Sequence, residues 1–276
     1  MLESVLNSDL IIHTAELLLL NAVVTVACFF VLWRISVIIR DPSFIDSWWA
    51  LGMVVTALVS IDLQKGEGTH GILLAGLCTV WGVRLGGYLL WRWRKNGADR
   101  RYKTMMGKAE AEKGWSYAKA TLLLVFALQA PLQFVVSLPV QLGQIAPDMP
   151  LGALGVAGVV LAVVGILFET LADWQLARFK GDPANVGKVL DTGLWRYTRH
   201  PNYFGDVCVW WGLYLIAADT GLIGALSIPG PILITFLLTR WSGIPTVEGR
   251  MRRKRPEYEA YVQRTSSLIP LPPRRA

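Results

Sequence analysis

Histidine and cysteine, which build most metal sites and all disulfides, are scarce in this sequence, with three of each among 276 residues. Cys28, Cys78 and Cys208 each lie inside an apolar run, where cysteine behaves as a small buried hydrophobic residue. The histidines are scattered at positions 13, 70 and 200. A disulfide framework and a histidine-rich metal centre, as in membrane hydroxylases and desaturases, are therefore excluded, and we expect no metal.

Charged residues are also few, at 17% of the chain, whereas hydrophobic residues make up 53%. A chain this apolar cannot bury its side chains in an ordinary soluble core, so the composition predicts an all-α, polytopic integral membrane protein. The net charge of +7 reflects basic residues gathered in loops on one side of a bilayer. It does not indicate nucleic-acid binding.

Apolar runs of about 20 residues, the length that a helix needs to cross the hydrocarbon core, divide most of the chain. Seven such runs lie near 16–34, 44–63, 70–91, 118–142, 150–171, 203–218 and 221–240. The connections after the first, third and fifth runs carry nearly all the loop lysines and arginines. By the positive-inside rule the N-terminus is outside and the tail is cytoplasmic. The closing PLPPRR is expected to be a disordered end.

Ionisable side chains inside apolar runs are costly and usually face a cavity or a partner. Asp46 lies near the start of the second run, and Trp81, Arg84 and Tyr88 share one helix face in the third because they are three and four residues apart. We predict that Asp46, Arg84 and Tyr88 line a cavity that opens to the cytoplasmic side, together with acidic groups near the fifth and sixth runs. The alternative is a buried structural pair of Asp46 and Arg84.

The stretch between the fifth and sixth runs is polar and rich in cations. It contains Lys180, Lys188, Arg196 and Arg199, and Arg240 follows at the end of the seventh run. Such cations suit a phosphorylated ligand, because Arg and Lys donate charge-assisted hydrogen bonds to phosphate oxygens. In TRHPNYFGD the proline suits the first turn of a helix, whose free N–H groups bind anions. For each cation taken alone, the alternative is a solvated rim beside lipid headgroups.

The segment GLWRYTRHPNYFGD, preceded by DWQLARFK and followed by RPEYEAYVQRTSSLIP, resembles the DUF1295 family of bacterial membrane proteins, which is related to steroid 5-alpha-reductases. The resemblance covers about Phe44 to Pro273 and is strongest from Glu169 onward. More distantly, RHPNYFG and the closing YxxY and IP elements resemble sterol C14 reductases and isoprenylcysteine carboxyl methyltransferases. These relatives imply a helical enzyme of the bacterial inner membrane with a cofactor cavity that faces the cytoplasm.

The resemblance also implies how the chain is divided. We expect one transmembrane domain over residues 1–276, with helices on the substrate side at 16–142 and the cofactor side at 150–276. The cofactor side includes the cytoplasmic tail and a loop at 172–202 that moves to admit the cofactor.

In the 5-alpha-reductases the cofactor is NADPH, and the resemblance implies residues for it here. Asp173 and Lys180 match cofactor-contacting positions at the end of a helix, while Asn202, Asp206 and Arg240 match an asparagine, an acidic residue and an arginine of that site. The other implied cofactor residues are Arg178, Lys188, Tyr197, Arg199, His200 and Tyr203.

The substrate side matches the reductases less well. The Gln-Glu pair and the tyrosine that polarise a steroid carbonyl correspond here to Asp46-Ser47 and Trp81. We therefore expect Asp46, as a protonated donor, and Tyr88, with Arg84 beside it, to take the catalytic role.

Together these patterns predict an NADPH-dependent membrane reductase that transfers hydride to a carbon-carbon double bond of a lipid or steroid-like enone drawn from the bilayer. Two alternatives stay open. One is a methyltransferase that uses S-adenosylmethionine on a lipid, and the other is a non-enzymatic lipid-binding protein. The sequence does not indicate an oligomeric state.

Overall fold

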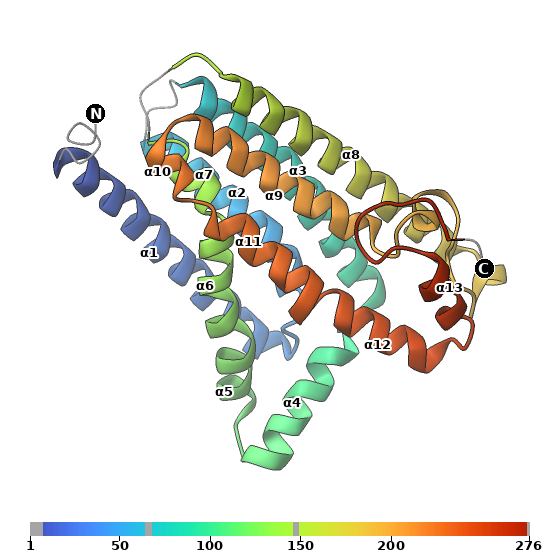
Figure 1. The fold of residues 1–276 in the computed structure, drawn as a ribbon. Coiled ribbons are helices and arrows are strands. Elements are labelled where there is room, and N and C mark those ends of the chain that lie inside the picture. Colours follow the sequence, from blue (N-terminus) through green and yellow to red (C-terminus); the bar gives the residue numbers. More distant parts are fainter. Residues whose placement is uncertain (1–7, 64–67, 146–148, 275–276) are drawn as a thin grey trace. The chain divides into compact units, whose positions relative to one another are not determined.

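The computed structural model describes residues 8–63, 68–145 and 149–274 (Figure 1). In these residues the regular structure is helical, and the one exception is an isolated bridge between Thr198 and Ser266. Six segments among them are long and apolar enough to cross a membrane: Ser8–Ile39, Ile45–Leu63, Thr69–Asn96, Tyr117–Val136, Ala153–Gly181 and Leu222–Lys254. The predicted all-α, polytopic membrane fold is confirmed.

The seventh predicted run, 203–218, lies in helix α9 (Pro201–Asp219). This helix is long enough to span but less apolar than the six segments above, because Asn202 and Asp206 lie in its first turns. Length and composition therefore mark six spans among the described residues and not seven. The number of crossings and the orientation of the chain stay predictions.

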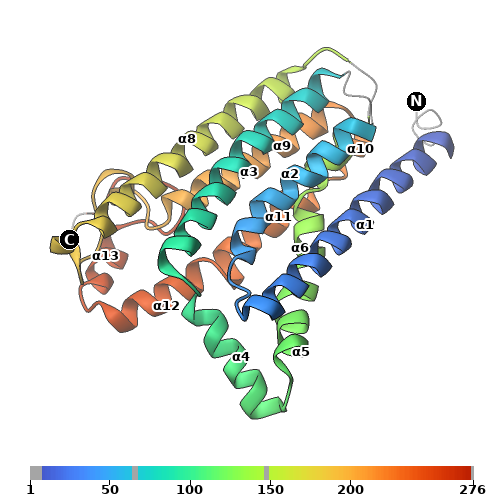
Figure 2. The same ribbon diagram turned by 180° about the vertical axis from the view of Figure 1, so that it is seen from behind.

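The chain forms two compact units, the first comprising Met1–Gly155 with Leu213–Gly230 and the second Val156–Gly212 with Pro231–Ala276. The complete helices of unit 1 are α1 (Ser8–Ile39), α2 (Ile45–Leu63), α3 (Thr69–Asn96), α4 (Arg100–Lys113), α5 (Tyr117–Thr121), α6 (Ala127–Val136), α7 (Leu138–Leu142) and α10 (Leu222–Ala225), with a π-helical turn at Leu122–Phe126. Helices α1, α2 and α3 lie side by side (Figure 2).

Glycines allow α2 and α3 to pack with their backbones close together. A Cβ atom on Gly82 would lie 2.9 Å from the carbonyl oxygen of Ala50, and one on Gly86 would lie 3.0 Å from that of Ser47. Small residues four apart on a membrane helix are typical of such close packing. The contact places the start of α2, which carries Asp46, beside the part of α3 that carries Arg84.

A buried contact between a histidine and a carboxylate holds together three segments of unit 1. The Nε2 atom of His70, in the first turn of α3, lies 2.8 Å from Oδ2 of Asp219, the last residue of α9. The same oxygen accepts a hydrogen bond of 2.7 Å from the backbone N–H of Gly152, directly before α8 (Ala153–Gly181). Both side chains are at least nine-tenths buried, so this pair has a structural role.

Unit 2 holds most of α8, the first part of α9, α11 (Pro229–Phe236) from Pro231 onward, the π-helical turn Leu237–Trp241, α12 (Ile244–Lys254) and α13 (Tyr258–Arg264). Helices α8 and α9 approach closely at glycines, because a Cβ atom on Gly205 would lie 2.7 Å from the backbone N of Glu169. Helix α8 continues to Gly181. The predicted loop 172–202 is therefore helical over residues 172–181, since the polar end of this long helix does not interrupt its hydrogen bonding.

Candidate functional site

Asp46 accepts two hydrogen bonds from α4. The Tyr102 hydroxyl donates to its Oδ1 at 2.7 Å, and the Arg101 guanidinium donates to its Oδ2 at 3.0 Å. This geometry is that of an ionised carboxylate, which accepts hydrogen bonds and donates none. Asp46 acts here as an acceptor, in contrast to the protonated donor that the sequence predicts. Its ionic partner on α4 is Arg101, whereas the alternative interpretation of the sequence paired it with Arg84.

The two partners of Asp46, Arg101 and Tyr102, both have raised pKa values. Burial alone would lower the pKa of Arg101, but its hydrogen bond with Asp99 and the charges of Asp46 and Asp99 outweigh burial and raise the pKa above the usual range. Burial, followed by the charge of Asp46, raises the pKa of Tyr102 far above that of a free tyrosine. Arg101 is thus charged and Tyr102 protonated under all ordinary conditions.

Two glutamines continue this network into α6. The Gln129 amide nitrogen lies 3.5 Å from the Tyr102 hydroxyl, and its oxygen accepts a bond of 2.6 Å from the Trp49 indole. Gln133 donates to the backbone carbonyl of Trp49 at 3.0 Å. None of these partners was predicted, because the contacts join residues that are at least 27 positions apart and no local pattern reveals them.

Arg84 and Tyr88 lie four residues apart on α3, both half-buried, as their spacing predicts. The Tyr88 ring stacks on Trp91, with centroids 6.1 Å apart. Trp81 is buried on the same helix. All three predicted catalytic residues therefore belong to unit 1, on the closely packed pair α2 and α3.

The predicted cofactor residues, apart from Arg240, come from the end of α8, the start of α9 and the connection between these helices, all in unit 2. Glu169 and Asp173 are 3% and 7% exposed, unusual values for carboxylates in an apolar helix. Since the backbone of Gly205 meets that of Glu169, the two helices bring Asp173 and Asn202 to the same end of their contact. That Asp173, Asn202 and Asp206 form one cofactor site stays a prediction.

The connection from 182 to 200 folds back on α8. The Trp195 indole donates to the carbonyl of Ala172 at 3.2 Å, and the Leu194 N–H donates to the Gln175 side chain at 3.0 Å. The Asn185 amide donates to the carbonyl of Phe179 at 3.1 Å. Five of the residues predicted to bind the ligand are exposed around this folded connection: Arg178, Lys180, Lys188, Arg196 and Tyr197.

Arg199 and His200 are buried, and both meet Glu248 of α12. Arg199 donates from Nε to Oε1 of Glu248 at 2.8 Å and from Nη1 to the carbonyls of Val262 and Thr265. The Nε2 atom of His200 lies 3.1 Å from the same carboxylate oxygen, and the His200 ring stacks flat on Tyr203. Arg199 thus joins the RHPNYFG motif to α12 and to the end of α13.

The surroundings of His200 keep it neutral. Burial lowers the pKa of its imidazole below 6.5, and the nearby Arg199 charge acts in the same direction. The hydrogen bond and charge of Glu248 oppose both effects without cancelling them. Glu248 was not among the predicted site residues, although a carboxylate near basic residues in α12 is a visible sequence signal.

The tail is ordered through Arg274, so the prediction of a disordered end is wrong for the described residues. The Tyr261 hydroxyl donates to the carbonyl of Trp195, and the Arg199 N–H donates to the carbonyl of Ser266 at 2.8 Å. The Leu271 N–H donates to the carbonyl of Tyr197 at 3.0 Å. These bonds attach the tail to the connection that precedes α9.

Arg240 is exposed in the π-helical turn that leads into α12. In residues 8–63, 68–145 and 149–274, no three His, Cys, Asp or Glu side chains are arranged to hold a metal ion.

Its apolar helices, and the ionisable clusters at their ends, define the chain as a polytopic helical membrane protein. The family model described as "Protein of unknown function (DUF1295)" matches residues 32–265, and the chain belongs to this family. An uncharacterized protein of Schizosaccharomyces pombe is 23% identical over 278 aligned residues, which cover 87% of this chain and 76% of that protein. No solved structure matches.

Proposed function

We propose that this protein is an NADPH-dependent membrane reductase that transfers hydride to a carbon-carbon double bond of a lipid or steroid-like enone. The observation that carries the proposal is the composition of unit 2. Exposed cations surround a connection that is bonded to α8, beside the buried carboxylates Glu169 and Asp173 and the polar start of α9. Phosphates require cationic donors, and a carboxamide requires both donors and acceptors, which side chains of these kinds offer.

The side chains divide into those that fit this cofactor and those that are already engaged. Lys180, Lys188 and Arg240 are exposed and suit the phosphates. Asn202 and Asp206, half-buried at the start of α9, suit the carboxamide half. Arg199 is committed to Glu248 and the tail, so in this proposal it orders the connection and does not hold phosphate. When bound, NADPH supplies the hydride.

Reduction of an enone builds negative charge on its carbonyl oxygen, and a donor aimed at that oxygen lowers the barrier. Tyr88 is the group in unit 1 proposed for this role. Asp46 enters the proposal as the carboxylate that positions Arg101 and Tyr102.

A methyltransferase that uses S-adenosylmethionine is the second candidate, and one observation favours it. The arginine of the RHPNYFG motif is bound to Glu248, so the motif itself offers one cation fewer for a phosphate than its sequence suggests. A sulfonium cofactor requires no phosphate ligands.

Equilibrium binding of NADPH and of S-adenosylmethionine to the detergent-purified protein distinguishes these functions. We expect NADPH to bind, and Asn202→Ala and Arg240→Ala each to weaken binding by about tenfold or more, as expected for the loss of a charge-assisted or buried hydrogen bond. Arg250→Ala, an exposed cation on α12 outside the candidate site, is the matched control and should bind as the wild type does. Binding of S-adenosylmethionine alone would replace the reductase with the methyltransferase, and binding of neither would favour a non-enzymatic lipid-binding protein.

A further inference from the structure

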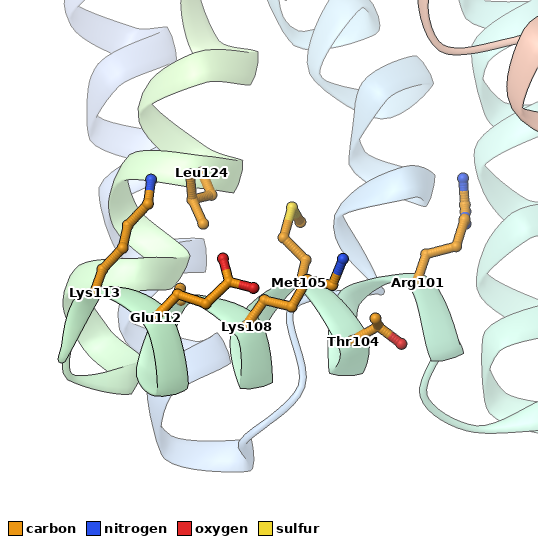
Figure 3. A pocket seen from close by; sticks show the side chains of 8 residues that line it. Arg101, Thr104, Met105, Lys108, Glu112, Lys113 and Leu124 are labelled. Atoms are coloured by element: carbon orange, nitrogen blue, oxygen red, sulfur yellow. The ribbon is translucent and has the colours of Figure 1, made fainter.

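A shallow pocket of about 360 Å³ lies along α4, with Arg101, the partner of Asp46, at one end (Figure 3). Its apolar surface comes from Met105, Ala109 and Leu124, and Lys108, Glu112 and Lys113 form its polar rim. All of these except Leu124 belong to α4, and Leu124 belongs to the π-helical turn that follows α5. The pocket therefore combines an apolar floor with charged groups along its length (Figure 3).

The floor of this pocket is held in place by the core of unit 1. Tyr102, Met106 and Ala109 of α4 are buried in a cluster with Phe126, and Met105 and Leu124 pack against that cluster. Helix α4 is capped at both ends: Asp99 accepts a hydrogen bond from the N–H of Arg101, and Gly114 closes the helix in a left-handed conformation with φ 61°. The helix that carries most of the lining residues is thus anchored in unit 1.

The segments that precede and follow α4 determine how deep this helix lies in the membrane. Helix α3 and the segment Tyr117–Val136 are both able to span a membrane, and α4 connects them. Lys113 and Lys119 lie over the ring of Trp115 at 4.6 and 5.1 Å. Tryptophan beside lysine at the end of a membrane helix is typical of the lipid headgroup layer. A helix in this position lies at the level of the lipid headgroups, with its buried apolar residues packed on the core of unit 1 and its lysines within reach of the headgroups.

We propose that this pocket binds one anionic phospholipid from the bilayer, with the phosphodiester held by Lys108 and Lys113 and the upper acyl chain on Met105 and Leu124. The charges support this occupant. Arg101, at the end of the pocket, is paired with Asp46 and Asp99 at 3.0 Å each, and neither carboxylate lines the pocket. The charged groups of the lining that are not engaged in this pairing are Lys108, Lys113 and Glu112. The remaining single positive charge complements a headgroup with one negative charge, such as phosphatidylglycerol.

The test counts phospholipid that stays bound. The full-length protein is purified in mild detergent, supplied with phosphatidylglycerol or phosphatidylcholine of matched chain length, and analysed by native mass spectrometry. We expect one phosphatidylglycerol to be retained, and Lys108→Gln with Lys113→Gln to weaken its binding by about tenfold or more, since each interfacial lysine contributes about 1 kcal/mol. Free glycerol phosphate should not compete, because it lacks the acyl chain.

Arg100→Gln with Lys103→Gln is the matched control, because these cations lie on the same helix but do not line the pocket. It should retain the lipid within about twofold of wild type, since removing distant charges weakens only the general attraction to anionic lipid. Equal loss in both double variants, or retention in both, would overturn the site. Glu112→Gln should strengthen phosphatidylglycerol binding; weaker binding would mean that Glu112 holds a headgroup ammonium and would overturn the anionic assignment.

Discussion

A single carboxylate, Glu248, receives both Arg199 and His200 in the interior of unit 2. Glu248→Ala would leave the Arg199 guanidinium buried without its counter-charge, and removing one partner of a buried ion pair costs about 3–5 kcal/mol. We expect a large fall in the thermal unfolding midpoint in detergent. The tail should also become sensitive to protease, because Arg199 joins the motif to Val262 and Thr265.

Glu259→Ala is the comparison for that substitution. Glu259 pairs with Arg252 at 3.3 Å, but both side chains are more than half exposed, and exposed ion pairs contribute about 0–1 kcal/mol. The thermal unfolding midpoint of the Glu259→Ala variant should stay close to that of the wild type. If Glu248→Ala were equally mild, the buried cluster would not hold unit 2 together.

His200 makes the stability of the fold depend on pH. Its pKa is lowered in the folded protein, mainly by burial, so the unfolded chain takes up a proton at a higher pH than the folded chain does. The resulting stabilisation is complete above the ordinary histidine pKa and is lost as the pH falls through the folded value. We expect the unfolding midpoint to fall from pH 7.5 to 5, and the fall to be smaller in His200→Gln. Parallel curves for the two proteins would show that another group is responsible.

Sequence reasoning succeeded for residues whose neighbours are near in the chain. The spacing of Arg84 and Tyr88 predicts a shared helix face, and the helix start at Pro201 follows from its motif. It failed for Asp46, whose partners Arg101 and Tyr102 lie 55 and 56 residues away. A carboxylate can be paired or free with the same local sequence, because its partner comes from the packing of another helix.

The close packing of α2 against α3 requires a glycine at position 82, because a side chain there would separate the two helices. In Gly82→Ala the new methyl group would lie 2.9 Å from the Ala50 carbonyl oxygen and closer still to Val54. We expect this overpacking to cost about 1–3 kcal/mol, measured as a lower unfolding midpoint. Since Asp46 and Tyr88 lie on these helices, turnover of any identified substrate should fall as well.

Gly87→Ala tests the alternative that alanine is harmful anywhere on α3. A Cβ atom on Gly87 would meet nothing within 4 Å, and alanine favours a helix over glycine by about 0.5–1 kcal/mol. This variant should be as stable as the wild type or more stable. Equal destabilisation of both variants would contradict the close contact of α2 with α3.

Apolar runs located the long helices well, because the length of an apolar run reflects the thickness of the membrane. They did not locate α4, which was predicted only as a basic connection. Its mean hydropathy is low, and it is held by three buried side chains, Tyr102, Met106 and Ala109. They also ended α8 too early, since residues 172–181 keep their helical hydrogen bonds outside the apolar run.

The chain is not a simple series of membrane spans, because its division into two units does not follow the order of the sequence. Residues 213–230 belong to unit 1, whereas the chain on both sides of them belongs to unit 2. The amino-acid composition cannot reveal which helices pack together in one unit, because any apolar helix surface can pack against any other. The contact between the His70 imidazole and the Asp219 carboxylate is one that fixes the returning segment within unit 1.

The orientation of the chain depends on whether α9 crosses the membrane. With the six segments of high apolarity alone, both termini would lie on one side; with α9 as a seventh crossing, they lie on opposite sides, as the distribution of basic residues predicts.

In a background with Cys28, Cys78 and Cys208 changed to alanine, we expect Ser8→Cys to react with an impermeant maleimide in sealed cells. Arg274→Cys should react only after permeabilisation, as should the control Glu110→Cys on the basic helix α4. Reaction of both termini from the same side would mean that Asn202 and Asp206 keep α9 from crossing, and that the candidate cofactor residues at its start need another explanation.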